Sequence, residues 1–226
     1  MGAPRRAGVA WLVLAALMLW PALAGAQQKG EPGRFDHYVL ALSWSPSYCE
    51  AMGERAEPAQ CATARPFAFV VHGLWPQYKR GWPENCVTPA PYVPEPVLRS
   101  MLDIMPSRRL VLHEWRTHGT CATPDPAAYF DLVRRAYAGV TIPAAFRRLD
   151  DYRMVSPAEV ESAFRADNPG LAADMIAVGC DGRRLTEVRI CLDRSLGFTP
   201  CPEVDRRACR AARVVMPPVR EGASAR

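Results

Sequence analysis

The sequence lacks several short motifs that would assign it to a common enzyme class. It contains no two cysteines in a CxxC spacing, no GxSxG and no GxxxxGK[ST] loop. These absences remove the sequence support for a thioredoxin-like redox site, a serine hydrolase and a P-loop nucleotide site. Lysine is also scarce, since only Lys29 and Lys79 stand among 28 basic residues. No internal repeat is visible, so a solenoid is not expected.

Long apolar runs are missing everywhere except at the N-terminus. Arg5 and Arg6 precede an uncharged apolar stretch at residues 8–20, and small residues at 24–26 suit a cleavage site. The stretch is shorter than the roughly 20 residues that a membrane-spanning helix needs. This pattern predicts a signal peptide over residues 1–26 that is removed on export. We therefore expect a secreted or periplasmic protein with no membrane attachment after removal of the leader.

The remaining composition is that of one globular domain. The chain has 226 residues, of which 49% are hydrophobic and 23% charged, enough for one core. A formal net charge of +5 is only mildly basic and argues weakly for an anionic partner. All eight cysteines follow the leader, and an even number in an exported chain predicts four disulfides. Spacing alone leaves their pairing open.

Hydrophobic periodicity predicts strands, then helices, then strands again. In the first strand Tyr38, Leu40, Leu42 and Trp44 alternate onto one face, and the stretch after Trp44 is expected to be a loop. This order favours a single α+β domain with a central, mainly antiparallel sheet and helices packed around it. Residues 221–226 are expected to form a disordered tail. The expected strands are 35–44, 67–72, 174–179, 185–192 and 213–216, and the expected helices are 97–105, 110–121, 126–138 and 156–166.

Histidine is scarce, and three of the four histidines lie in two short segments. His72 belongs to HGLWPQ, whereas His113 and His118 belong to HEWRTHGTC. If residues 110–121 form an α-helix, Glu114 and His118 lie about 40° apart around its axis. A carboxylate one turn from a histidine can hold the ring and raise its pKa. The second segment therefore predicts a histidine prepared for proton transfer.

Two histidines beside a glutamate also suggest zinc, but the spacing is unsuitable. The zinc protease signature places its histidines four residues apart, whereas His113 and His118 are five apart. We therefore expect no metal and no cofactor. His37 is interpreted as a surface histidine or a satisfied polar group, and Trp44 and Trp115 as core residues.

The segments FDHYVLALSWSPSYC, HGLWPQ and HEWRTHGTC resemble, in order and spacing, the opening segment and the two active-site segments of the ribonuclease T2 family. The resemblance runs from about Phe35 to Val219 and implies a ribonuclease domain over residues 27–220. It implies metal-free cleavage of single-stranded RNA by attack of a ribose 2′-hydroxyl on the neighbouring phosphorus. The product is a 2′,3′-cyclic phosphate that is slowly hydrolysed to a 3′-phosphate. DNA lacks the 2′-hydroxyl and is not expected to be cut.

Positions in the family motifs imply the role of each catalytic residue. The resemblance implies that His118 is the base and His72 the acid of the first step, with the roles exchanged during hydrolysis. It implies that His113 and Glu114 stabilise the phosphorane and orient the reacting groups. This division meets the chemical need for one proton acceptor, one proton donor and a means of balancing charge.

One position departs from the family pattern. Family members commonly carry a lysine immediately before the last histidine of the second motif, where this chain has Thr117. Arg116 lies about 100° further round an α-helix, so it compensates only if its side chain bends back. The resemblance implies that Trp75 stacks on a base, with Gln77 and Thr117 beside the substrate. The departure keeps an alternative open, in which a weakly active or inactive member of the same fold binds RNA or protein.

The resemblance also implies a disulfide pairing. One bridge ties the chain after His72 to the segment of His118, which gives it the most direct bearing on the site. We expect the protein to be a monomer. The implied pairs are Cys49–Cys61, Cys86–Cys121, Cys180–Cys209 and Cys191–Cys201.

Overall fold

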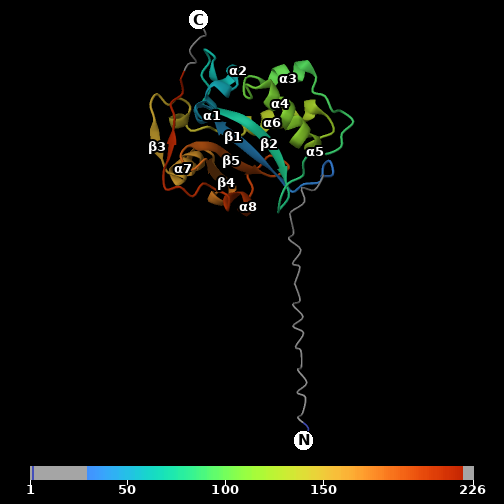
Figure 1. The fold of residues 1–226 in the computed structure, drawn as a ribbon. Helices are drawn as coiled ribbons and strands as arrows, with labels where there is room; N and C mark the ends of the chain where they lie inside the picture. The colour runs from blue at the N-terminus through green and yellow to red at the C-terminus, as the bar shows by residue number, and fades with distance from the viewer. Residues whose placement is uncertain (1, 3–29, 221–226) are drawn as a thin grey trace.

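The structure is a computed structural model that describes residue 2 and residues 30–220 (Figure 1). The predicted leader, apart from Gly2, and the predicted tail at 221–226 lie outside the described residues. Within the described part of the chain, no helix has both the length and the apolar character needed to cross a bilayer.

A four-stranded antiparallel sheet forms the centre of the molecule. β1 (His37–Trp44) lies between β2 (Phe69–Gln77) and β5 (Leu185–Leu192), and β4 (Ile176–Cys180) pairs with the other side of β5. Every neighbouring pair is antiparallel. The strand order β2-β1-β5-β4 places β2 at one edge of the sheet, next to the helices that follow it in sequence (Figure 1).

A smaller antiparallel sheet pairs β3 (Arg153–Val155) with β6 (Val214–Met216). β6 confirms the predicted last strand. β3 was not predicted, because a strand of three residues with two exposed side chains is too short to show an alternating pattern.

The longer helices cover the sheet on two sides. α3 (Glu95–Met101), α4 (Arg108–Glu114) and α6 (Pro126–Ala138) lie on the β2 side, and α7 (Pro157–Asp167) packs on β4 (Figure 1). Two helix starts follow the sequence signals. The side chain of Asp125 caps α6, and that of Ser156 forms a capping box with Glu159 at the start of α7.

Short helical segments fill the connections. The expected loop after Trp44 is wrong, because Ser45–Met52 forms α1 with a proline in its first turn. Serine and proline begin helices as readily as turns, so the local composition did not distinguish the two. The other short segments are α2 (Pro58–Cys61), α5 (Thr120–Ala122), α8 (Pro202–Asp205) and 3-10 turns at Gly53–Arg55, Ala144–Phe146 and Ala173–Met175.

One hydrophobic core lies between the sheet and the helices. The predicted alternation in β1 is confirmed, since Tyr38, Leu40, Leu42 and Trp44 are all buried in this core. Trp115 is also fully buried there, as predicted. The residues of β1 that alternate with these lie on the opposite face of the sheet, and that face carries the candidate site.

β2 is longer than predicted and irregular. It was expected to end at His72, but its pairing with β1 continues to Gln77. Ala41 pairs with Gly73, and the next residue of β1 pairs with Val71, so His72 is an extra residue without an opposite partner. This β-bulge shifts the alternation along β2, which is how bulges near active sites re-aim a side chain.

The predicted helix at 110–121 is not one α-helix. α4 ends at Glu114, and Trp115–Gly119 forms a π-helical turn in which the Thr120 N–H donates to the carbonyl of Trp115. A π-helical turn has more residues per turn than an α-helix, so the angles expected around this helix are wrong. Residues five apart come closer to the same face than α-helical spacing implies.

Four disulfides staple the fold, and no cysteine of the described chain is free. The bridges are those that the family resemblance implies. They join Cys49 to Cys61, Cys86 to Cys121, Cys180 to Cys209 and Cys191 to Cys201.

Candidate active site

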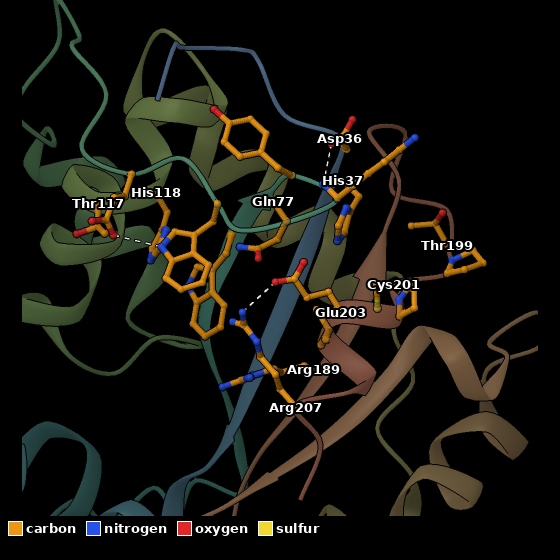
Figure 2. Close-up of a pocket in the computed structure, with 18 of the residues that line it drawn as sticks. Asp36, His37, Gln77, Thr117, His118, Arg189, Thr199, Cys201, Glu203 and Arg207 are labelled. Carbon is orange, nitrogen blue, oxygen red and sulfur yellow. Dashed lines mark hydrogen bonds and ion pairs between the residues drawn. The ribbon is translucent and has the colours of Figure 1, made fainter. Parts of the chain in front are cut away.

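A cavity of about 860 Å³ opens on the face of the sheet away from the core (Figure 2). Its walls come from four sources: the sheet, the π-helical turn with the end of α4, the chain that follows β2 at residues 78–84, and the segment around α8. The sheet contributes Trp75 and Gln77 from β2 and Arg189 from β5, and the helical wall includes His118. A cavity of this size holds a nucleotide-sized ligand.

His72 is not among the residues that line this cavity, but its ring lies 5.2 Å from that of Trp75, which does, and it faces a carboxylate on another strand. Its Nδ1 is 3.2 Å from Oε2 of Glu187 in β5, although β1 runs between the two strands. The contact is possible because β1 presents only Ala41 and Ser43 here. Burial alone would lower the pKa of His72, but the hydrogen bond to Glu187 and the negative charges of Glu114 and Glu187 outweigh burial and raise it.

Glu187 and Arg189 are site residues that the sequence reasoning missed. Oε1 of Glu187 accepts a hydrogen bond from Nε of Arg189 at 2.6 Å, and the Arg189 guanidinium lies 5.8 Å from the centre of the Trp75 ring. Burial opposes the charge of Glu187, but hydrogen bonding to His72 and the charge of Arg189 lower its pKa overall. A signal was present in LTEVRICL, where opposite charges two residues apart share one face of an otherwise apolar strand.

His118 has no such partner, which corrects the sequence prediction. Glu114 does not hold it: Nδ1 of His118 is buried without a hydrogen bond to any described residue. Burial, together with the positive charges of His113 and His72, lowers the pKa of His118 to about 3. The α-helical geometry that predicted a raised pKa is absent here, because His118 belongs to the π-helical turn.

Glu114 instead holds Trp75. The indole Nε1 of Trp75 donates a 2.8 Å hydrogen bond to Oε2 of Glu114, which is 1% exposed. Burial raises the pKa of Glu114 to about 7, against the opposing effects of His72 and Trp75. Gly73 makes this contact possible, because a methyl group there would overlap both the carboxylate and the indole nitrogen. The Trp75 ring is fixed 5.2 Å from His72 and 5.6 Å from His118, measured between ring centres.

The two remaining residues expected in the site lie on the helical wall of the cavity. His113 and Thr117 line the cavity, and Oγ1 of Thr117 is 3.5 Å from Nδ1 of His113. Burial lowers the pKa of His113, and the charge of Arg116 lowers it further. Arg116 does not bend back to replace the missing lysine. Its Nε donates to the carbonyl of Leu112, and its side chain lines a different cavity.

The cavity also contains groups that the sequence did not assign to a site. His37 lines it rather than forming a satisfied surface group, because its Nε2 is buried without a hydrogen bond to any described residue (Figure 2). Burial lowers the pKa of His37. Glu203 pairs with Arg207 at 2.9 Å, and Arg207 lies 5.6 Å from the centre of the Trp82 ring. These groups add polar and aromatic side chains to the lining of the cavity.

Comparison with known proteins connects this geometry to one family. The model of the Ribonuclease T2 family matches residues 35–201. A protein named Ribonuclease from Aeromonas hydrophila is 43% identical over 112 residues, which cover 49% of each chain. A probable ribonuclease from Haemophilus influenzae is 34% identical over 48% of this chain and 44% of its own. The chain thus aligns with about half the length of these two relatives. Ribonuclease I from Escherichia coli is 29% identical over 80% of this chain and 84% of its own.

Solved structures share the fold. RNase NT, in a complex with 5′-AMP, matches 82% of this chain and 99% of its own with a TM-score of 0.58 and 24% identity. An RNase-related protein from Calystegia sepium matches 83% of this chain and 99% of its own with a TM-score of 0.62 and 22% identity. At these identities the structures establish the α+β fold, whereas the family model covers well over half of the sequence. The chain belongs to the ribonuclease T2 family.

Proposed function

We propose that the protein is an endoribonuclease that cleaves single-stranded RNA by transphosphorylation. In the first step a ribose 2′-hydroxyl gives its proton to His118 and its oxygen attacks the adjacent phosphorus. The bond from phosphorus to the 5′-oxygen breaks, and that oxygen takes a proton from His72. The products are a 2′,3′-cyclic phosphate and a free 5′-hydroxyl. Water then opens the cyclic phosphate with the two roles exchanged, which leaves a 3′-phosphate.

The observation that carries this proposal is the position of two histidines in opposite surroundings beside one tryptophan: His72 faces Glu187, and the buried Nδ1 of His118 has no hydrogen bond to any described residue. The neutral form of His118 is favoured, because its pKa is lowered to about 3. The charged form of His72 is favoured, because Glu187 raises its pKa. A neutral imidazole accepts a proton and a charged one donates it, so these surroundings support His118 as the base and His72 as the acid. With Nδ1 of His72 facing Glu187, Nε2 is the atom left to donate.

The remaining site residues complete the proposed reaction. Trp75, held by Glu114, offers an aromatic face beside both histidines on which an unpaired base can stack. Gln77 uses its side-chain N–H on the carbonyl of Pro76, which leaves its oxygen for a donor on the substrate. His113 and Thr117, together on the helical wall, are placed to contact the phosphoryl group.

The protein is further proposed to act outside the cytoplasm after removal of its leader. Four disulfides in the described chain are consistent with an oxidising compartment.

The test is to incubate protein purified with EDTA with single-stranded RNA and to analyse the product ends. We expect 2′,3′-cyclic phosphates, and no cleavage of a DNA of the same sequence. The kcat should fall on acidification towards pH 3, where His118 becomes charged, and on alkalinisation above the raised pKa of His72. Binding of RNA without any cyclic product between pH 4 and 8 would instead establish an inactive RNA-binding member of the fold.

A further inference from the structure

The proposed reaction needs positive charge beside the phosphoryl group. The phosphorane carries more negative charge than the phosphodiester, so fixed cations or donors must stabilise it. His118 is neutral when it acts as the base, and Thr117 carries no charge. Glu114 and Glu187 lie close to His72 and add negative charge when ionised. Apart from the charged His72, which gives up its proton during the step, these groups provide no lasting positive charge, and a permanent cation from another part of the site would stabilise the phosphorane.

Three permanent cations line the cavity, and they are not equivalent. Arg207 is paired with Glu203 and lies over Trp82. Lys79 follows β2 in the chain, and its backbone N–H donates to Asp36. Arg189 alone among the three lies over Trp75, the ring that stands between the two catalytic histidines.

The hydrogen bonds of Arg189 leave part of its guanidinium for a ligand. Nε and Nη2 both contact Oε1 of Glu187, at 2.6 and 2.5 Å. Nη1 makes no hydrogen bond to any described residue, and the side chain is 32% exposed within the cavity wall. Because Oε2 of Glu187 faces His72, one carboxylate fixes both the acid and this arginine.

We infer that Arg189 supplies the positive charge that Thr117 lacks, and that it contacts a non-bridging phosphoryl oxygen through Nη1. The inference rests on the proposed function. The positive charge would then come from β5, an interior strand of the sheet, rather than from the helical segment that carries His118. Arginine suits this position, because its planar group can hold Glu187 on one side and a phosphate on the other.

The experiment is a double-mutant cycle on kcat for cyclic phosphate formation. Arg189→Met should lower kcat about 10²-fold, and Arg189→Lys should lower it less. Thr117→Lys should raise kcat at least about tenfold when it is added to the Arg189→Met variant. In the wild-type protein the same substitution should change kcat by less than about threefold. Arg184→Met is the matched control. Arg184 precedes the same strand, pairs with Glu50 and Asp181 and lies outside the cavity, so its loss should leave kcat unchanged.

A merely structural role for Arg189 predicts different results. If Arg189 only balances the charge of Glu187, Thr117→Lys will not restore kcat in the Arg189→Met variant. The positive charge of Arg189 also lowers the pKa of His72, so Arg189→Met should move the alkaline limb of the pH profile upward. The inference would be overturned if Arg189→Met kept more than half of the wild-type kcat. It would also be overturned if Thr117→Lys changed kcat equally in the wild-type protein and in Arg189→Met.

A binding measurement separates this inference from the proposed function. If the wild-type protein forms no cyclic product, the proposed function fails. Titration with inorganic phosphate then tests Arg189 directly as an anion site. We expect about tenfold weaker binding of phosphate by Arg189→Met and no change in Arg184→Met. Equal phosphate affinity of Arg189→Met and wild type would overturn the inference whatever the activity.

Discussion

The two histidines at the centre of the site come from two irregular regions with opposite surroundings. His72 is the extra residue of a bulge in β2 and faces the carboxylate of Glu187. His118 belongs to the π-helical turn, and its buried Nδ1 has no partner among the described residues. The pKa of His72 is raised, whereas that of His118 is lowered to about 3. Identical side chains thus have their pKa values shifted in opposite directions by their neighbours, and the irregular backbone places each one.

The largest effect is expected from removing either histidine. His72→Ala and His118→Ala should each lower kcat by about 10²–10⁴, the usual contribution of a positioned acid or base. Binding of a DNA oligonucleotide that cannot be cleaved should persist, measured by fluorescence anisotropy. In the residual activity, His118→Ala should remove the acidic limb of the pH profile and His72→Ala the alkaline one. Retention of more than half of wild-type kcat by either variant would contradict its role.

The next effect concerns the bridge between the two regions. Cys86 follows β2, and Cys121 lies just after the π-helical turn, 35 positions further along the sequence. Replacing both by serine should destabilise the fold by about 4 kcal/mol in the chain-entropy model, against about 3 kcal/mol for Cys49 and Cys61, which are 12 apart. Urea unfolding of the two double-serine variants measures both losses of stability.

Activity below the unfolding transition distinguishes the two bridges further. Loss of Cys86–Cys121 should lower kcat, because it frees the helical wall from the strand. Loss of Cys49–Cys61, outside the cavity, should leave kcat near the wild-type value. Equal losses of activity in both variants would show that the first bridge has no special effect on the site.

Sequence patterns predicted the regular elements well. β5 occupies the residues expected from its apolar run, and α6 and α7 begin where Asp125 and Ser156 provide caps. Periodicity and capping are local, so they can be recognised without knowledge of the fold. The family segments also pointed to His72 and His118 before any geometry was known.

The irregular regions and the contacts across strands could not be predicted in the same way. Gly73 and Pro76 in HGLWPQ are typical of a strand end, whereas pairing with β1 continues through both. The Glu187–His72 contact depends on β1 lying between β5 and β2 and on the small side chain of Ala41. No local pattern contains that arrangement, because it depends on pairing between distant segments.

A smaller effect is expected where the two regions touch. A methyl group at Gly73 would overlap Glu114 and the indole nitrogen of Trp75, so Gly73→Ala should force the strand away from the helix. We expect a loss of stability of about 1–3 kcal/mol, measured by urea unfolding, and a fall in kcat. Gly139→Ala is the control, because its φ is −76° and the nearest atom to a new methyl group is 3.4 Å away. Wild-type kcat in Gly73→Ala would show that the contact is not required.

A substitution at Glu187 is expected to have a still smaller effect, because it changes the charge of the side chain without changing its shape. Glu187→Gln removes the negative charge that faces His72 and keeps the side chain's size. Burial already opposes the charged form of His72, so the pKa of that histidine should fall. His72 then loses its proton at a lower pH, and the alkaline limb of the kcat profile moves to lower pH. Above that limb kcat should fall about tenfold for each unit by which the pKa drops.

The acidic limb should stay in place, because His118 owes its low pKa to burial and to the charges of His113 and His72. Glu187 itself has a lowered pKa, so it remains ionised throughout the range in which His72 titrates. Glu161→Gln is the matched control. Glu161 is a half-buried carboxylate on α7 that accepts a hydrogen bond from the N–H of Val178, outside the cavity, so this substitution should move neither limb. An alkaline limb that stays in place in Glu187→Gln would mean that His72 is not the acid, or that Glu187 does not set its charge. Direct titration of the His72 ring by NMR separates these two causes. If His72 is not the acid, its pKa still falls in Glu187→Gln, whereas if Glu187 does not set its charge, the pKa is the same as in the wild type.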